Sequence, residues 1–481
     1  MTALPLTGIS DGRLMPHSDA GTDLASSALF ARIDRLPGCW TLWRMVVMLS
    51  LGGFFEFYEL FSTAYVMPGI VRSGILTATT ASFFGLNGIA SYIAATFAGL
   101  FIGTLVFGSV ADRCGRRAVF TYSLLWYSAC AVVTAFQTDA AGLNFWRFMT
   151  GIGLGVELVT IDAYLSELVP PHMRGRAFAL NQVITYLAVP SVALAAWLLV
   201  PKAPAGVDGW RWVIAAGGAG SLIVWALRRG LPESPRWLAG AGQIERAERI
   251  VARIEERVQR ETGEKLPPPT SAPARPDARR GNFRELWGRH YLSRTVMLVI
   301  FHVAQAIGLY GFSHWVPTFL TQQGVSVSKS LAFTLAIAFV TPVGPLLAMA
   351  FADRIERKWQ IAVSALLVAM AGLAFAQARS PIAIIGLGSV VTLGATIISL
   401  NFHAYQAELF PTRIRALAIG FVYSTSRVSG MLSGFLIAYA LGHHGVPAAL
   451  SLIAACMAVV ALSIGLLGPK TLHRSLEELN T

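Results

Sequence analysis

Ionisable side chains within long apolar stretches are the residues of this sequence whose types and spacing could do chemistry. Glu56 and Glu59 occur in Gly52-Gly-Phe-Phe-Glu-Phe-Tyr-Glu59, three residues apart, so both side chains fall on one face of a helix. Glu59 follows Arg44 by 15 residues, a rise of about 22 Å in a helix, which places it past the bilayer centre. Burial and a nearby guanidinium shift the pKa of a carboxyl group in opposite directions, so these acids are candidates for proton binding and release.

Arg427 lies near the centre of another apolar stretch, within Gly420-Phe-Val-Tyr-Ser-Thr-Ser-Arg-Val-Ser-Gly430. An arginine at the centre of a membrane helix costs about 2.5–3.5 kcal/mol on insertion scales, and more without a partner. We therefore expect it to meet an anion, and a substrate carboxylate held through two parallel hydrogen bonds would suit its planar guanidinium. The alternative is a partner within the protein, either Glu157 or a backbone carbonyl group.

The two halves of the chain repeat one template. Asp112 and Asp353 lie in two similar basic turns, 241 residues apart. The same offset relates three pairs of residues in two later turns: Glu167 and Glu408, Pro170 and Pro411, Arg174 and Arg415. Internal repeats in an apolar chain indicate a transporter whose halves move around a central site.

The charges inside the apolar stretches do not follow this repeat. The residue 241 positions after Glu59 is Ile300, and the residue 241 positions before Arg427 is Tyr186; Arg147 likewise has no charged counterpart. We infer a division of labour, in which the first half handles a proton and the second half binds the charge of the substrate.

Composition indicates a membrane protein. Hydrophobic residues make up 54% of the 481 residues and charged residues 13%, about half the usual charged share of a soluble domain. The mean hydropathy is +0.58. The net charge of +12 would suggest nucleic acid on a soluble chain, but here we expect no nucleic-acid partner. Of the 38 lysines and arginines, five fall in segments expected outside, two inside apolar stretches, and the rest in segments expected in the cytoplasm, which places both termini there.

Apolar stretches of roughly 20 residues recur twelve times, as expected for membrane-spanning helices. They lie approximately at 44–69, 84–111, 118–136, 143–167, 177–200, 211–230, 295–319, 329–352, 360–377, 382–409, 415–441 and 446–467. The expected fold is therefore an all-α membrane protein with two six-helix bundles. Its domains would be a cytoplasmic tail (1–42), a first bundle (43–230), a cytoplasmic central segment (231–294), a second bundle (295–467) and a tail (468–481).

Two segments outside these stretches are also expected to be helical. Within the central segment, an apolar stripe from Ile244 to Val258 at three- and four-residue steps predicts an amphipathic helix. Residues 266–281, rich in Pro and Arg, are typical of a flexible linker. Residues 26–37 could form a short amphipathic helix on the inner membrane surface.

Three motifs together resemble those of the major facilitator superfamily. They are Asp112-Arg-Cys-Gly-Arg-Arg117, the segment from Glu167 through Pro170 to Arg174-Gly-Arg176, and Pro232-Glu-Ser-Pro-Arg236. Within that superfamily the chain is similar to the sugar-porter and metabolite:proton symporter branches, over about residues 30 to 470. The resemblance implies two six-helix bundles, a site at the membrane midplane and alternating access.

The resemblance also implies roles for the buried acids. In sugar-porter proton symporters, an acid in this Gly-Gly-x-x-x-x-Tyr context pairs with an arginine of the fourth helix, and Glu59 and Arg147 match those positions. Aromatic-acid:proton symporters carry two acids at a spacing of three in the first helix, which Glu56 and Glu59 also match. The alternative to proton coupling is a fixed ion pair that holds the first and fourth helices together.

Charged residues in the repeated turns are expected to form a cytoplasmic gate. The resemblance implies that clusters of acids and arginines break and re-form there as the inner mouth opens and closes. The alternative is that the arginines only hold the loops in the cytoplasm. The candidate gate residues are Asp112, Arg113, Arg116, Glu167, Arg174, Arg176, Asp353, Arg354, Glu408 and Arg415.

Candidate substrate contacts combine one cation with polar and aromatic side chains. They are Arg427, Gln182, Gln305, Tyr310, His403 and Glu157. Gln182 and Gln305 match sugar-contacting glutamines of sugar porters. Ala304, Tyr310 and His403, however, stand where sugar porters carry a glutamine, an asparagine and a tryptophan. These departures favour a small aromatic or heterocyclic acid over a sugar.

The sequence therefore predicts a secondary transporter that imports a small organic anion with protons. Its expected location is the plasma membrane, as the inner membrane of a bacterium. A sugar or polyol proton symporter and a drug or metabolite efflux antiporter are the alternatives. No nucleotide-binding loop, nucleophile constellation or metal-ligand cluster is visible. We therefore expect no enzyme activity and no cofactor, and we expect a monomer whose partners are the lipid bilayer, protons and a carboxylate substrate.

Overall fold

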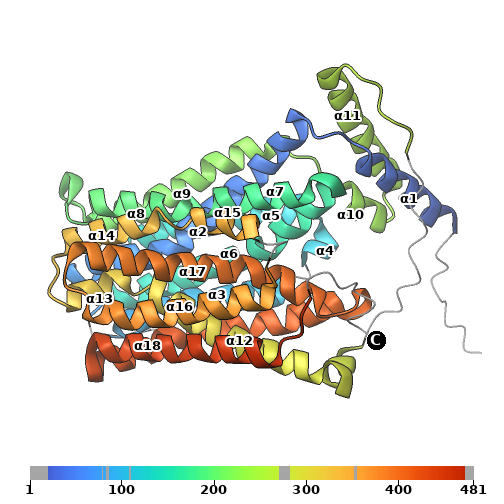
Figure 1. The fold of residues 1–481 in the computed structure, drawn as a ribbon. Coiled ribbons are helices and arrows are strands. Elements are labelled where there is room, and N and C mark those ends of the chain that lie inside the picture. The colour runs from blue at the N-terminus through green and yellow to red at the C-terminus, as the bar shows by residue number, and fades with distance from the viewer. Residues whose placement is uncertain are drawn as a thin grey trace, which may run out of the picture.

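The computed structural model describes residues 20–77, 80–82, 86–107, 110–269, 282–351 and 355–471. Long helices run side by side along one axis (Figure 1). In the described part, ten helices are long and apolar enough to cross a membrane. One of them, α18 (Thr412–Leu462), contains two spans, because the backbone breaks at Gly445 (φ 74°) just before Pro447. With the apolar helix α9 (Gly209–Leu227), the described helices supply the twelve expected spans.

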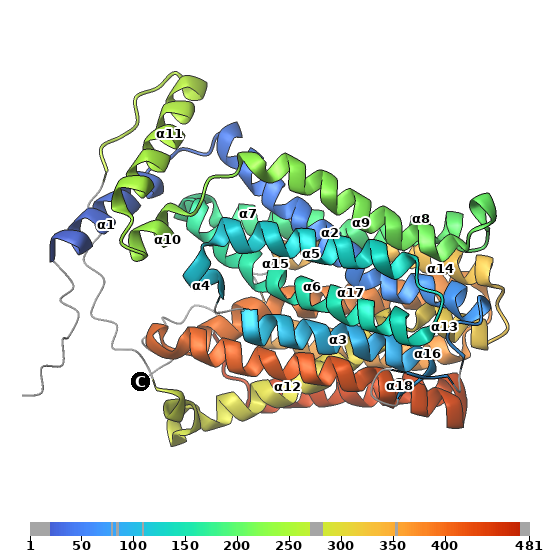
Figure 2. The ribbon, with the colours of Figure 1, turned by 180° about the vertical axis from the view of Figure 1, so that it is seen from behind.

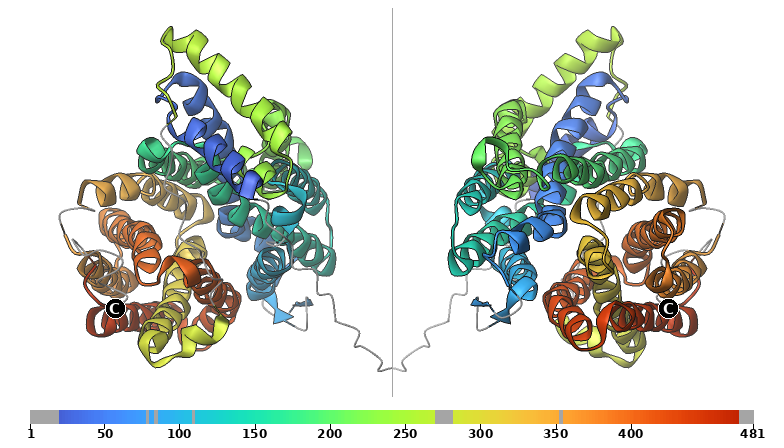
Figure 3. Two further views of the ribbon diagram at one scale, coloured as in Figure 1. Left: turned by 90° about the vertical axis from the view of Figure 1, so that its right-hand side faces the viewer. Right: turned by 90° about the vertical axis from the view of Figure 1, so that its left-hand side faces the viewer.

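The spans form two bundles, seen along the helix axes in Figure 3. The first bundle contains α2 (Trp40–Arg72), α3 (Gly88–Phe107), α5 (Arg116–Ala135), α6 (Ala140–Leu168), α7 (Pro171–Tyr186) with α8 (Ala188–Leu199), and α9. The second contains α12 (Arg289–Ser313) with α13 (Val316–Gln322), α14 (Val327–Ala338) with α15 (Val343–Phe351), α16 (Arg357–Gln377), α17 (Pro381–Glu408) and α18. Short elements connect them: β1 (Ala81–Ser82), β2 (Leu86–Asn87), α4 (Val110–Cys114), and the single turns η1 (Pro204–Gly206), η2 (Arg228–Gly230), η3 (Phe283–Trp287) and η4 (Ser463–Leu467).

The helices α3 and α6 pack closely because glycines face each other between them. A Cβ atom added to Gly99 of α3 would lie 2.2 Å from the carbonyl oxygen of Phe148, and one added to Gly151 of α6 would lie 2.4 Å from that of Thr96. Small residues permit such an approach of two membrane helices. Consequently Arg147 of α6 lies directly against α3.

Three helices outside the membrane bundles pack together at one end of the molecule (Figure 1). They are α1 (Ala20–Asp34), α10 (Pro235–Gly240) and α11 (Ile244–Thr262), and we call this end the α11 side. The helix α11 contains the apolar stripe predicted from Ile244 to Val258. Leu29 and Ile33 of α1 are buried against this stripe, so the apolar face of α1 packs on protein rather than only on the membrane surface. Residues 270–281 of the expected linker lie outside the described residues.

The repeat of 241 residues is visible in the packing of the two bundles. Tyr164 of α6 donates a hydrogen bond to the carbonyl oxygen of Pro232, which follows the last helix of the first bundle. Tyr405 of α17, 241 positions later, donates to the carbonyl oxygen of Pro469 at 2.8 Å, just after the last helix of the second bundle. Each bundle is therefore closed at its α11 side by the same kind of contact.

Candidate functional site

A cavity of about 600 Å³ lies between the two bundles. Residues of α2, α3, α6, α7 and α8 line it from the first bundle, and residues of α12, α14, α17 and α18 line it from the second. Five of the side chains expected at a proton or substrate site reach this cavity: Glu56, Gln182, Tyr310, His403 and Arg427. The structure thus brings together residues that are up to 371 positions apart in the sequence.

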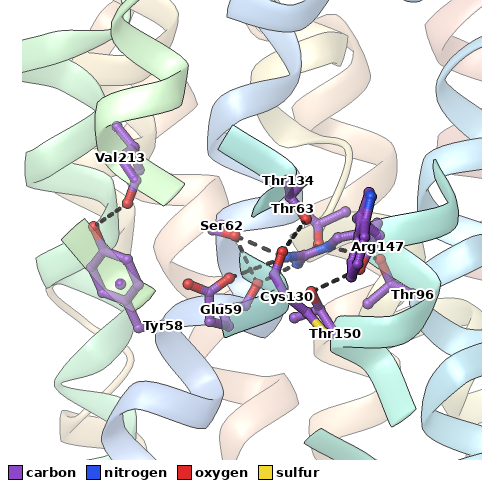
Figure 4. Close-up of polar contacts among 12 residues, drawn as sticks. Tyr58, Glu59, Ser62, Thr63, Thr96, Cys130, Thr134, Arg147, Thr150 and Val213 are labelled. Carbon is purple, nitrogen blue, oxygen red and sulfur yellow. Dashed lines mark hydrogen bonds and ion pairs between the residues drawn. The ribbon is translucent and has the colours of Figure 1, made fainter. Parts of the chain in front are cut away.

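Glu59 and Arg147 form a buried ion pair beside the cavity, with 3.1 Å between Arg147 Nη1 and Glu59 Oε2 and neither side chain exposed (Figure 4). Arg147 also donates to the hydroxyls of Thr96 at 3.1 Å and Thr63 at 2.5 Å, and to the backbone oxygen of Glu59. Its guanidinium lies 5.3 Å from the ring centre of Tyr92. This network joins α2, α3 and α6, and neither partner of the ion pair lines the cavity.

Glu56 has different surroundings, one helical turn before Glu59 on α2. It is only 2% exposed but lines the cavity. Its Oε1 atom has no hydrogen-bond partner among the described residues. The two acids of the first span therefore have different environments. Glu59 is enclosed with an arginine, and Glu56 faces the cavity.

Arg427 of α18 supplies a cation to the cavity wall. It is 2% exposed, donates a hydrogen bond of 3.1 Å to the hydroxyl of Tyr423, and lies 4.7 Å from the centre of that ring. Its Nε atom is buried without a hydrogen-bond partner in the described part of the chain. Buried donors without partners are rare in folded proteins, so this guanidinium retains capacity for a ligand.

Glu157 does not partner Arg427, and its expected place at the substrate site is wrong for this structure. Glu157 is fully buried and pairs with Arg228 at 3.2 Å. Arg228 lies at the end of α9, donates to the backbone oxygens of Met48 and Leu49, and stacks 3.9 Å from the centre of the Phe120 ring. The arginine of a distant helix end reaches Glu157, because α6 and α9 both pack on α2.

Gln305 also lies outside the central cavity. It is buried within the second bundle, where it lines a small separate hollow together with Gly308 and Met457. In this conformation Gln305 therefore cannot contact a substrate bound in the central cavity, contrary to the expectation from the sequence. Gln182, the other glutamine expected from sugar porters, does line the cavity.

Asp162 is a cavity residue that sequence reasoning missed. It lies in α6, lines the cavity, and has an exposed side chain. The repeat could have identified it, because Asp162 lies 241 positions before His403, and His403 had been recognised as a candidate. The two residues occupy equivalent positions on α6 and α17 and face one cavity from opposite bundles.

Aromatic side chains of both bundles pack together at the end of the molecule away from the α11 side. His314, which follows α12, stacks on Tyr310 with ring centres 5.4 Å apart, and its ring lies 5.6 Å from those of Phe61 and Phe97. These contacts join the two bundles, as do those between α3 and α18, which lie side by side in Figure 2. In the other direction the lining reaches Asp162 and Gly420, near the helix ends on the α11 side.

Three of the candidate gate residues, Arg116, Glu167 and Glu408, take part in ion pairs, one pair in each bundle. Arg116 and Glu167 pair at 3.1 Å between α5 and α6, and Arg357 pairs with Glu408 between α16 and α17. The second pair repeats the first at the offset of 241 residues, since Arg357 corresponds to Arg116 and Glu408 to Glu167. Arg357 was missed as a candidate, although the offset from Arg116 identifies it.

The remaining gate candidates take no part in these pairs. Arg174 donates through Nε to the backbone oxygen of Val169 at 3.4 Å, while Arg113 and Arg176 are exposed. Asp353 and Arg354 lie outside the described residues, and so do the side chains of Asp112 and Arg415. Within the described part of the chain, the gate pairs each lie inside one bundle rather than between the two.

Comparisons with known proteins agree with this architecture. The family described as "Sugar (and other) transporter" matches residues 45–481. The putative metabolite transport protein YyaJ of Bacillus subtilis is 30% identical, over 92% of this chain and 95% of its own length. The niacin transporter NiaP of Acinetobacter baylyi is 27% identical, over 94% and 99%. The xylose transporter XylE of E. coli, in a partially occluded inward-open conformation, has a similar fold, with a TM-score of 0.71, 20% identity and coverage of 90% and 99%.

Proposed function

Because the chain belongs to the sugar (and other) transporter family of the major facilitator superfamily, we propose that it imports a small organic carboxylate together with protons. It is a multi-pass membrane transporter, and its bacterial relatives include inner-membrane metabolite transport proteins. We place the α11 side and both termini in the cytoplasm, since most lysines and arginines lie in segments on that side. The cavity, lined as far as Asp162 and Gly420, then faces the cytoplasm.

The observation that carries the substrate class is Arg427 in the cavity wall. Its guanidinium is desolvated, has an Nε atom without a partner in the described structure, and faces a space of about 600 Å³. A carboxylate can accept two parallel hydrogen bonds from one guanidinium. Tyr310, Tyr423 and His403 around it offer ring faces and edges to a flat substrate. One relative is a niacin transporter, and niacin is an aromatic heterocyclic carboxylic acid.

The proton would be carried by the acids of α2. Glu59 lies in a fully buried ion pair with Arg147, so that separating the two would leave a desolvated carboxylate that favours protonation. Glu56 lines the cavity one turn away and is the alternative carrier. A relative of this chain is an arabinose-proton symporter, 25% identical over 88% of each chain. This relative supports proton coupling. A sugar substrate remains the alternative hypothesis.

The substrate class can be tested by comparing an acid with its amide. Niacin carries a carboxylate where nicotinamide carries a neutral carboxamide of similar size. Replacing Arg427 by Gln should weaken niacin binding by about tenfold to a hundredfold, since hydrogen bonds to charged groups contribute about 1.5–3 kcal/mol. Nicotinamide binding should change by less than about twofold. Arg427→Lys should restore only part of the loss, because lysine lacks the planar pair of donors.

Calorimetry on the purified protein measures binding of the acid and the amide. Uptake into proteoliposomes under a pH gradient measures transport. Equal losses for the acid and the amide in a correctly folded Arg427→Gln protein would make Arg427 structural. The alternative hypothesis, a sugar or polyol substrate, would then be favoured. Outward-directed transport driven by the same gradient would instead support the efflux antiporter.

A further inference from the structure

The ionisable side chains of the cavity wall are divided between the two bundles. Glu56 and Asp162 come from α2 and α6 of the first bundle, whereas Arg427 and His403 come from α18 and α17 of the second. All four line the same space. One wall of the cavity is therefore acidic and the opposite wall carries the cation.

The two acids of this wall differ from Glu59 and Glu157, the fully buried acids of the same bundle. Glu59 and Glu157 each hold a buried arginine, at 3.1 Å and 3.2 Å. Neither Glu56 nor Asp162 has an ion-pair partner in the described part of the chain, and Glu56 Oε1 has no hydrogen bond there either. The arginines buried beside the acids of this bundle are thus already engaged, and two carboxyl groups remain directed at the cavity.

Glu56, Asp162 and Arg427 line one cavity of about 600 Å³. Tyr423, which holds Arg427 by a hydrogen bond, lines the same cavity. The acidic wall and the cation are thus close enough to act on one small molecule. A ligand that carried only a negative charge would satisfy Arg427 but would leave the two carboxyl groups of the facing wall without a partner.

We propose that the substrate is dipolar, with a carboxylate bound to Arg427 and a cationic nitrogen facing Glu56 and Asp162. This inference rests on the proposed function and specifies the substrate of the same cavity. Phe57 and Tyr186, which line the cavity from the same bundle as these two acids, can also attract a cationic group through their ring faces. A pyridinium or other nitrogen-centred cation on a flat acid fits this combination of charges and rings.

A dipolar substrate would also link binding to transport. Its two ends would be held by different bundles, so its binding free energy would be largest when the bundles approach each other around it. A ligand shifts a conformational equilibrium only through a difference in affinity between the two states. A simple anion would bind only to the second bundle, so its affinity would differ less between the two conformational states.

Four probes of one shape test the proposal. They are 3-methylbenzoate, 1-methylpyridinium-3-carboxylate, 1-methylpyridinium-3-carboxamide and 3-methylbenzamide, which carry a negative charge, both charges, a positive charge and no charge. Binding of each to the full-length protein at neutral pH is measured by calorimetry. The dipolar probe should bind at least tenfold more tightly than the other three.

Two variants assign the cationic subsite. Asp162→Asn and Glu56→Gln should each reduce the preference for the dipolar probe over 3-methylbenzoate by about fivefold or more. They should leave 3-methylbenzoate binding unchanged or improved. Asp162 has an exposed side chain, so its amide should not disturb folding. Glu256→Gln on the exposed face of α11 removes a carboxylate outside the cavity and should change none of these ratios.

Several results would overturn the proposal. They are 3-methylbenzoate binding as tightly as the dipolar probe, the cationic probe binding best, none of the four probes binding, and a dipolar preference that survives both variants. The proposed function fails separately. If 3-methylbenzoate binds in an Arg427-dependent way and its uptake follows the pH gradient, the proton-coupled carboxylate transporter stands while the dipolar substrate is rejected.

Discussion

Two carboxyl groups one helical turn apart on α2 have different access to the cavity. Glu59 is enclosed by Arg147 and the hydroxyls around it, while Glu56 is on the cavity wall. A proton can reach Glu59 only if the network around Arg147 rearranges. The network joins α2, α3 and α6, which are parts of one bundle, so such a rearrangement would belong to a change within that bundle.

At the scale of the residue, we expect Glu59→Gln to abolish accumulation driven by a pH gradient while leaving exchange of substrate measurable. The amide is nearly isosteric but cannot carry a proton between the two sides. Uptake and counterflow into proteoliposomes are the measurements, with Glu256→Gln on the exposed face of α11 as a matched acid-to-amide control. Undiminished accumulation by Glu59→Gln would move the coupling role to Glu56, and Glu56→Gln would then be the variant that loses accumulation.

At the scale of the element, Gly52 allows α2 to pack against a buried ion pair. A Cβ atom at this position would lie 1.5 Å from Arg228 Nη2 and 2.4 Å from Glu157 Oε1. The guanidinium of Arg228 therefore occupies the space that a side chain of α2 would need. This contact ties together α2, α6 and the end of α9.

We expect Gly52→Ala to lower the thermal stability of the protein in detergent. Overpacking of a close contact typically costs about 1–3 kcal/mol, and here it would also disturb a buried ion pair. Gly372→Ala in α16 is the matched control, since no atom lies within 4 Å of its added Cβ. Replacing glycine by alanine in an open helix position stabilises it by up to about 1 kcal/mol. Equal melting temperatures for the two variants would contradict the role given to Gly52.

A second contact between elements lies outside the membrane bundles, where Glu255 of α11 binds Arg32 at 2.5 Å and Arg35 at 2.6 Å. Burial raises the pKa of Glu255, but the hydrogen bonds and charges of the two arginines outweigh it and hold the pKa below its ordinary value. The attachment of α1 to α11 is therefore complete above about pH 4.3, the ordinary value for glutamate. It weakens as the pH falls through the lower pKa of the folded protein.

We expect Glu255→Gln to increase amide hydrogen exchange in α1 at neutral pH. The wild-type protein should show the same increase only on acidification. Glu256→Gln, the neighbouring acid on the exposed face of α11, is the control. Protection of α1 that is the same in the Glu255 variant and in the wild type would show that the apolar contacts of Leu29 and Ile33 hold α1 without the ion pairs.

At the scale of the whole molecule, the two bundles carry equivalent ion pairs at the α11 side. Arg116 with Glu167 and Arg357 with Glu408 are related by the offset of 241 residues. In the described structure each pair lies within its own bundle, while the aromatic contacts around His314 join the bundles at the other end. We expect these charged ends to exchange partners with charges of the opposite bundle when the cavity closes at the α11 side.

We expect Glu167→Gln and Glu408→Gln to shift the protein in the same direction, toward the state open at the α11 side. The measurement is maleimide labelling of Gly420→Cys, a cavity position with open space for a Cβ. The exposed Cys114 is replaced by Ser in all proteins. Each variant should raise the labelling rate without changing the order of affinities for competing substrates. Unchanged labelling with a changed order of affinities would place these acids at the substrate site instead.

Sequence alone determined the class of the protein and the residues that carry charge in the membrane. Apolar stretches of spanning length, the repeat and the cost of a buried charge depend only on residue type and spacing. They suffice to identify twelve spans, two halves, and Glu56, Glu59, Arg147 and Arg427 as unusual. The same repeat contained the pairing of Arg357 with Glu408 and the equivalence of Asp162 with His403, although neither was recognised.

Only the tertiary structure decided which charges meet. From the sequence, Glu157 was the alternative partner for Arg427 within the protein, but it binds Arg228, whose helix end reaches it across α2. Gln305 and Gln182 both matched glutamines of sugar porters, yet only Gln182 lines the cavity. Helical spacing fixes which residues share a face, whereas the rotation and packing of each helix against its neighbours decide whether that face meets a cavity, another helix or lipid.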